Sequence, residues 1–172
     1  IAQELKISPD EIKNKKTEHT IWVFRGQNND KKLTIRPDAI FFEYEKYDSY
    51  NQVKNEFIKI INLIQDTYKE LICSRLGVRY INEIDNNNLG EEIFKWDKYI
   101  NKNLLGIFDF LPENKIIARA FNNLELNYGS YNLRFQFGMH NPDYPAQIKS
   151  KIFVLDYDAY FQGPLSILEL PE

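Results

Sequence analysis

The longest strand-like pattern in the chain covers residues 71–85, LICSRLGVRYINEID. Leu76, Val78, Tyr80 and Ile84 alternate with mostly charged residues, which is the two-residue period of a pleated strand. One face of this predicted strand is therefore apolar enough to join a core, whereas the other is charged.

Two arginines flank a glycine on the charged face. Arg75 and Arg79 each lie two positions, roughly 7 Å, from Gly77, and point the same way. They could bind one anion or two carboxylates, or pair with acidic residues of neighbouring strands. Gly77 predicts a bulge, a bend or a close approach of other atoms to the backbone. Asn82 lies on the apolar face, where we expect a hydrogen bond, because a buried unpaired amide costs about 1–3 kcal/mol.

The segments before this strand predict a short meander followed by one long helix. Strand-like stretches cover 18–25, 32–36 and 39–45, separated by turns. Ser49 and Gln52 form a capping box that opens a helix over about residues 50–69. Its apolar positions recur at spacings of three and four, which predicts a helix lying on one face of a sheet. A shorter helix is predicted to open at Ser8, with Pro9 in its first turn.

The second half of the chain predicts more antiparallel strands. A short helix near 96–105 is expected to bury Trp96, Ile100 and Leu104. Residues 115–128 and 131–139 form a hairpin across Gly129-Ser130, and 150–160 is the last strand. The predicted fold class is α+β, with a large, curved antiparallel sheet of about seven strands covered by the long helix. We expect a single domain over 1–172. Because the chain begins with Ile, we interpret it as an excerpt of a longer protein.

Composition narrows the function mainly by exclusion. The 172 residues carry a net charge of −3, which disfavours a nucleic-acid partner held by bulk electrostatics. The single Cys73 excludes an intrachain disulfide and favours a reducing, cytoplasmic compartment. No membrane-spanning run is present in the sequence, so a membrane partner is not expected. One cysteine and two histidines give no zinc-site spacing, and no phosphate-binding glycine loop or nucleophile elbow is found.

The block RLGVRYINEI at 75–84 resembles a sporadically distributed prokaryotic family of uncharacterised proteins that share the pattern R-L-G-x-R-Y-I-N-x-I. The similarity extends to Tyr47 and Tyr50, to WDKYIN, and to VLDYDAY near the end. The resemblance implies no activity. The sporadic distribution that it implies suits an accessory or defence-type system.

Two pairs of carboxylates are the strongest candidates for chemistry. Glu43 and Glu45 share one strand face, as do Asp156 and Asp158, and either pair could hold magnesium or manganese. Together with arginines on neighbouring strands, they would suit a metal-dependent phosphohydrolase or a nucleotide-binding protein. The Glu-x-Glu-x-Lys pattern of triphosphate-hydrolysing tunnels is not met, because Lys46 directly follows Glu45. The alternative interpretation is that these acids form salt bridges with the arginines.

The sequence thus favours a non-enzymatic binding or protein-interaction domain without a cofactor. Its partner is expected to be a protein, with a small anionic ligand as the second candidate. The metal-dependent enzyme, which would need magnesium or manganese, remains the alternative. The candidate ligand-binding residues are Arg75, Arg79, Arg119 and Arg134.

Overall fold

The computed structural model describes residues 2–8, 11–17, 20–68, 71–87, 92–113 and 116–166. The chain divides into two compact units, Ile1–Glu70 and Leu71–Glu172. The single domain expected from the sequence stays a prediction. None of the helices in the described ranges has both the length and the apolar composition needed to cross a membrane.

The first unit begins with a two-stranded hairpin of β1 (Ala2–Ser8) and β2 (Glu11–Thr17). The helix predicted to open at Ser8 is wrong, because residues 11–17 pair with β1 as a strand. A helix of a few turns is marginal without packing against other elements, whereas strand pairing supplies partners for the backbone.

The main part of this unit is a three-stranded antiparallel sheet in the order β3-β4-β5. The strands are β3 (Trp22–Arg25), β4 (Lys31–Ile35) and β5 (Ile40–Tyr44). Antiparallel register places Phe24 opposite Leu33, and Leu33 opposite Phe42. These three side chains therefore share one face of the sheet.

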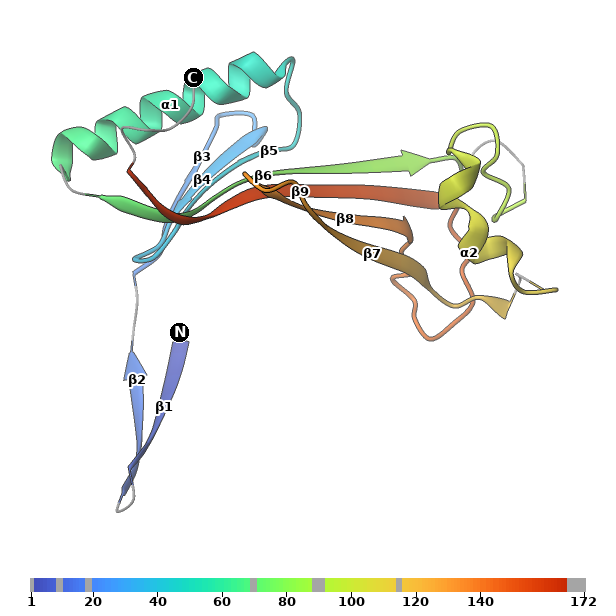
Figure 1. Ribbon diagram of the computed structural model, residues 1–172, viewed down its shortest axis with the longest axis horizontal. Coiled ribbons are helices and arrows are strands. Elements are labelled where there is room, and N and C mark those ends of the chain that lie inside the picture. Colours follow the sequence, from blue (N-terminus) through green and yellow to red (C-terminus); the bar gives the residue numbers. More distant parts are fainter. Residues whose placement is uncertain are drawn as a thin grey trace. The chain divides into compact units, whose positions relative to one another are not determined.

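Helix α1 (Tyr50–Thr67) lies along that face (Figure 1). Ser49 caps its N-terminus, where the Gln52 N–H donates to Ser49 Oγ at 3.3 Å and the Asp48 N–H donates to Gln52 Oε1 at 3.1 Å. The predicted N-cap at Ser49 is confirmed, but the second bond of the capping box differs, because Gln52 accepts from the Asp48 N–H rather than from the Ser49 N–H. No residue of α1 is buried, and Thr34 is the only buried residue among those described in this unit. The helix and sheet therefore pack without a closed core.

The second unit contains a four-stranded antiparallel sheet in the order β6-β9-β8-β7. Its strands are β6 (Ile72–Asp85), β7 (Ala120–Asn127), β8 (Asn132–Met139) and β9 (Ile152–Ser166). The predicted hairpin is confirmed: Gly129 has φ +83°, and the Tyr128 N–H donates to the Tyr131 carbonyl at 2.9 Å.

A hydrophobic core covers part of one face of the four-stranded sheet. Trp96, Phe108 and Phe153 are almost fully buried, with ring centroids 5.4 Å apart for Trp96–Phe153 and 6.2 Å for Phe108–Phe153. The Trp96 indole N–H donates to Met139 Sδ at 3.3 Å. The segment between β6 and β7, which contains α2 (Gly106–Asp109), lies across one end of the sheet (Figure 1).

The short helix predicted over 96–105 is displaced toward the C-terminus. Residues 93–99 form turns, Lys102–Leu104 is a 3₁₀-helix, and α2 follows directly. The predicted burial is correct for Trp96 and Ile100, and Leu104 packs partly buried against the core.

Two buried features fix the region around β8. The Asn141 side-chain amide donates to the Ala118 and Ala146 carbonyls at 2.8 and 2.6 Å, which joins the loop after β8 to the segment before β7. Gly138 has φ +141°, and a Cβ at this position would lie 2.1 Å from the Ala120 carbonyl oxygen. Only glycine permits so close an approach of the two strands.

The α+β class, the antiparallel strands and the long helix are confirmed. The seven main strands are, however, divided between a three-stranded and a four-stranded sheet rather than joined in one. Strand patterns report which face is apolar, but they carry no information on which edges pair.

Candidate functional site

The charged face of the four-stranded sheet carries three of the four arginines that the sequence singled out, Arg75, Arg79 and Arg134. The Arg75 Nη2 donates to both carboxylate oxygens of Asp158, at 2.9 and 3.0 Å, and its guanidinium lies 4.6 Å from the Tyr160 ring centroid. It reaches these partners by passing over Gly77, where an added Cβ would lie 2.9 Å from Arg75 Nη1. The close approach predicted at Gly77 is confirmed, and a register shift falls between Cys73 and Arg75.

Arg79 makes the more buried ion pair of this face. Its Nε and Nη2 donate to the two carboxylate oxygens of Asp156, at 2.9 and 2.6 Å. The Asp156 side chain is only 8% exposed, against 56% for Arg79. The hydrogen bonds that Arg79 donates to this carboxylate raise the pKa of Arg79, so its guanidinium stays charged.

The other two candidate arginines are also engaged. Arg134 Nε donates to Glu125 Oε1 at 2.8 Å, and this bond raises the pKa of Arg134 and lowers the pKa of Glu125. Arg119 lies outside the sheet face, with its guanidinium 4.4 Å from the Tyr144 ring centroid. The salt bridges expected on the alternative interpretation are therefore present for Arg75 and Arg79, whereas Arg134 pairs with Glu125, which was not among the candidate acids.

The four candidate carboxylates are divided between the two units. Glu43, on β5, and Glu45 belong to the first unit, where Glu43 pairs with Lys32 at 2.7 Å. Asp156 and Asp158 lie on β9 in the second unit and bind the arginines. Among the described residues, no group of three His, Cys, Asp or Glu side chains is arranged to hold a metal ion.

Asn82 departs from its predicted environment. It lies on the apolar side of β6 but is exposed to solvent. The reason is that β6 is an edge strand, so a side chain can face the core side and still reach water.

A different feature stands out in the first unit: the free edge of β3. In the described part of the chain β4 is the only strand paired with β3, and all four β3 residues are exposed. Trp22, Val23 and Phe24 are 59%, 51% and 53% exposed. An exposed apolar edge strand is a template for pairing with another strand.

The register shows which backbone groups are free at this edge. The Gly26 N–H donates to the Lys31 carbonyl at 2.9 Å, so these residues form a hydrogen-bonded pair. Because such pairs alternate along an antiparallel ladder, the N–H and C=O groups of Phe24 point toward β4. Those of Val23 and Arg25 point away from β4, toward solvent.

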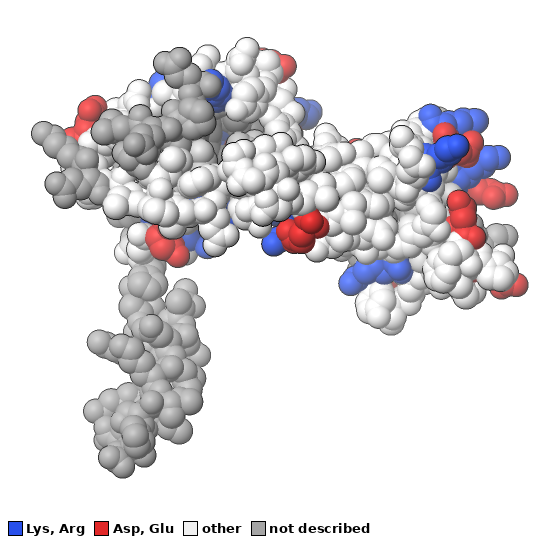
Figure 2. All heavy atoms as spheres, viewed as in Figure 1, with Lys and Arg blue, Asp and Glu red and all other residues white. Residues whose placement is uncertain are grey.

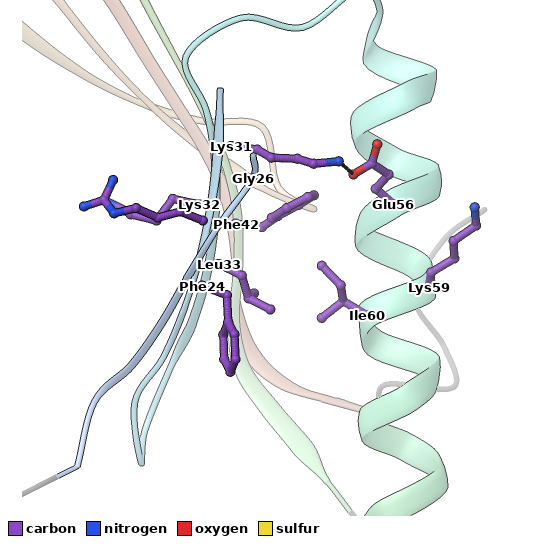
Figure 3. A pocket seen from close by; sticks show the side chains of 10 residues that line it. Phe24, Gly26, Lys31, Lys32, Leu33, Phe42, Glu56, Lys59 and Ile60 are labelled. Atoms are coloured by element: carbon purple, nitrogen blue, oxygen red, sulfur yellow. Dashed lines mark hydrogen bonds and ion pairs between the residues drawn. The ribbon is translucent and has the colours of Figure 1, made fainter. Parts of the chain in front are cut away.

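A groove runs beside this edge, between the sheet and α1. Figure 3 shows Leu33 and Phe42 from the sheet facing Ile60 from α1, with Phe24 nearby. The groove has a volume of about 310 Å³. The Lys31 ammonium donates to Glu56 Oε2 at 2.8 Å and so connects the sheet to α1 beside the groove (Figure 3).

The electrostatics at this connection centre on Glu56. The hydrogen bond from Lys31 is the main reason that the pKa of Glu56 lies below its usual value, and Tyr44 and Gln52 act in the same direction. Burial, with the nearby Glu56 carboxylate, raises the pKa of Tyr44 above its usual value. Glu56 is therefore ionised at neutral pH.

The sequence reasoning missed the β3 edge as a candidate site. A signal was present: Trp22, Val23 and Phe24 are consecutive apolar residues within a short strand. A run without alternation is typical of a strand covered on both faces. In a strand at the edge of a three-stranded sheet, it indicates apolar surface that another chain could cover.

On the face shown in Figure 2, basic and acidic side chains are interspersed, without a large patch of either sign. No protein-family model, curated protein or solved structure matches this chain. The resemblance of the 75–84 block to a prokaryotic family stays a prediction, and the function must be argued from the geometry.

Proposed function

We propose that this chain is a non-enzymatic protein-interaction domain, whose partner adds an extended segment to the free edge of β3. The observation that carries the proposal is the exposure of Trp22, Val23 and Phe24 on a strand with one unpaired edge. Strand addition supplies main-chain hydrogen bonds for affinity, and pockets for alternate side chains supply specificity.

The geometry beside β3 suits this mode of binding. An added strand would bond to the outward backbone groups of Val23 and Arg25, and its alternate side chains would face the groove below α1. In keeping with the single cysteine of the sequence, we place this interaction in the cytoplasm, as part of an accessory or defence-type system.

The alternative, a metal-dependent phosphohydrolase, gains no support from the described residues. Arg75, Arg79 and Arg134 each bind a carboxylate, and a phosphate would have to displace it. The role of these residues in binding a small anion stays a prediction.

A variant that blocks the edge without breaking the sheet tests the proposal. Val23→Pro removes an outward N–H, and proline is tolerated at such edge positions. Val23→Thr keeps the N–H and is the matched control. The immobilised wild type and both variants would be exposed to an extract of the source organism, and the retained proteins identified by mass spectrometry.

We expect a protein that is retained by the wild type and by Val23→Thr but lost with Val23→Pro. Equal melting temperatures of the three proteins would show that the sheet is intact. Retention that Val23→Pro leaves unchanged, or no retained protein with any of them, would contradict the proposal.

A further inference from the structure

The two faces of β3 differ in the side chains that they would offer to an added strand. Trp22 and Phe24 point to the α1 side, and Val23 and Arg25 point to the other side. A strand paired with β3 must present its own alternate residues to the same two faces. The chemistry of each face therefore limits the sequence of the segment that can bind.

On the α1 side, the surface next to Phe24 is apolar. Leu33, Phe42 and Ile60 line the groove, and its volume of about 310 Å³ can hold apolar side chains of an extended segment. The polar groups at its side, Lys31 and Glu56, already bind each other. A charged side chain placed between Leu33, Phe42 and Ile60 would lose water without gaining a partner there, because Lys59 points away from the sheet (Figure 3).

On the other side, Arg25 is a cation without a carboxylate partner among the described residues. Its neighbours differ in this respect, because Lys31 pairs with Glu56 and Lys32 pairs with Glu43. Because Lys31 and Lys32 are neutralised by these partners, Arg25 is the cation that this end of the β3 edge offers to an added strand.

We infer that the segment bound at β3 alternates apolar and acidic residues, with its apolar side chains in the groove and an acidic side chain paired with Arg25. This inference rests on the proposed function, because it names the chemistry of the partner at the same edge. A carboxylate opposite Arg25 gains a charge-assisted hydrogen bond, whereas a lysine there would be repelled.

The test uses a fluorescein-labelled peptide in which valine and glutamate alternate, and measures its binding to the full chain by fluorescence anisotropy. Two control peptides separate the contributions. One replaces each glutamate with lysine, and the other has the same composition with the valines and glutamates in separate blocks. We expect the alternating valine–glutamate peptide to bind at least about tenfold more tightly than either control, the effect of one charge-assisted hydrogen bond.

Variants of the protein then assign the binding to this edge. Arg25→Glu should weaken the valine–glutamate peptide about tenfold and strengthen the valine–lysine peptide, while Arg36→Glu, an exposed charge reversal away from the groove, should change neither. Ile60→Ala should weaken binding, and Ile58→Ala, on the same helix outside the groove, should not. An unchanged preference in Arg25→Glu would overturn the inference.

The remaining outcomes separate this inference from the proposed function. A partner that is retained from the extract and lost with Val23→Pro, together with no binding of the valine–glutamate peptide, would overturn the acidic segment and leave the interaction domain standing. Equal binding of all three peptides would also overturn the acidic segment and leave the interaction domain standing. A concentration-dependent dimer in analytical ultracentrifugation that Val23→Pro abolishes would show that a second copy occupies the edge, and would also overturn the inference.

Discussion

The two aspartates on the charged face of the four-stranded sheet differ in burial, and so in how much stability is lost without their arginine partners. The Asp156 carboxylate is 8% exposed and the Asp158 carboxylate is 17% exposed, and each binds one arginine through both oxygens. A buried carboxylate that loses its partner keeps the cost of desolvation without the compensating bond. Loss of the arginine partner should therefore destabilise the protein more at Asp156, the more buried acid, than at Asp158.

Arg79→Ala should lower the free energy of unfolding by about 2 kcal/mol, because it leaves the Asp156 carboxylate buried and unpaired. Arg75→Ala is the matched control and should cost about 1 kcal/mol or less, since Asp158 is more solvated. Urea denaturation at neutral pH measures both. An Arg79→Ala protein as stable as the wild type would contradict the structural role of this pair and would leave Arg79 for ligand binding.

At the scale of elements, α1 is only loosely attached to its sheet. The helix buries no residue completely, and Leu63 and Tyr68 at its C-terminal end are 68% and 63% exposed. The Lys31–Glu56 ion pair joins α1 to β4 directly. Because Glu56 is 29% exposed and Lys31 38%, this bond is only partly screened by water.

This ion pair should make the stability of the first unit depend on pH. The pKa of Glu56 in the folded protein lies below its reference value of 4.5, so its contribution is complete above that pH. The contribution is lost as the pH falls through the lowered pKa. We expect Glu56→Gln to be less stable than the wild type by about 0.5–1 kcal/mol at neutral pH, with the difference vanishing in acid, at a pH well below 4.5.

Urea denaturation at the two pH values measures this difference. Glu45→Gln serves as the control, because Glu45 is an exposed carboxylate of the same unit without an ion pair among the described residues. A wild type that keeps the same advantage over Glu56→Gln in acid would contradict the role of the ion pair.

At the scale of the whole molecule, buried side chains are concentrated in the second unit. Its core of Trp96, Phe108, Met139 and Phe153 lies on the central strands β8 and β9 and on the segment before β7. The first unit has no comparable core among its described residues. The second unit should therefore resist local opening more than the first, because this resistance increases with buried apolar contact.

Hydrogen exchange should show this distribution directly. We expect the amides of β8 and β9 to exchange most slowly, and those of Val23 and Arg25, which point away from β4, to exchange fastest within the sheets. On addition of a bound partner segment, protection should appear at Val23 and Arg25 and not at β7, the exposed edge of the other sheet. Amide-resolved exchange by nuclear magnetic resonance measures both. Slow exchange at Val23 in the free protein would contradict a free β3 edge.

The sequence by itself determined the local elements of this protein. Alternation in 71–85 predicted β6, the capping box at Ser49 predicted α1, and Gly129-Ser130 predicted the β7–β8 hairpin. Each of these signals arises within a few neighbouring residues, because strand period, helix capping and turn geometry are properties of the local backbone. The approach of other atoms to Gly77 was predictable for the same reason.

Only the tertiary structure decided which strands pair and which edge stays free. The Arg79–Asp156 bond joins β6 to β9, which are distant in sequence. The division of the strands between two sheets and the exposed edge of β3 likewise depend on which strands meet in the folded chain. Side-chain patterns fix the faces of a strand but leave its neighbours open, since backbone hydrogen bonds are the same for every sequence. Three of the four arginines that stood out in the sequence are bound to acids, whereas Arg25, which did not stand out, lies at the open edge.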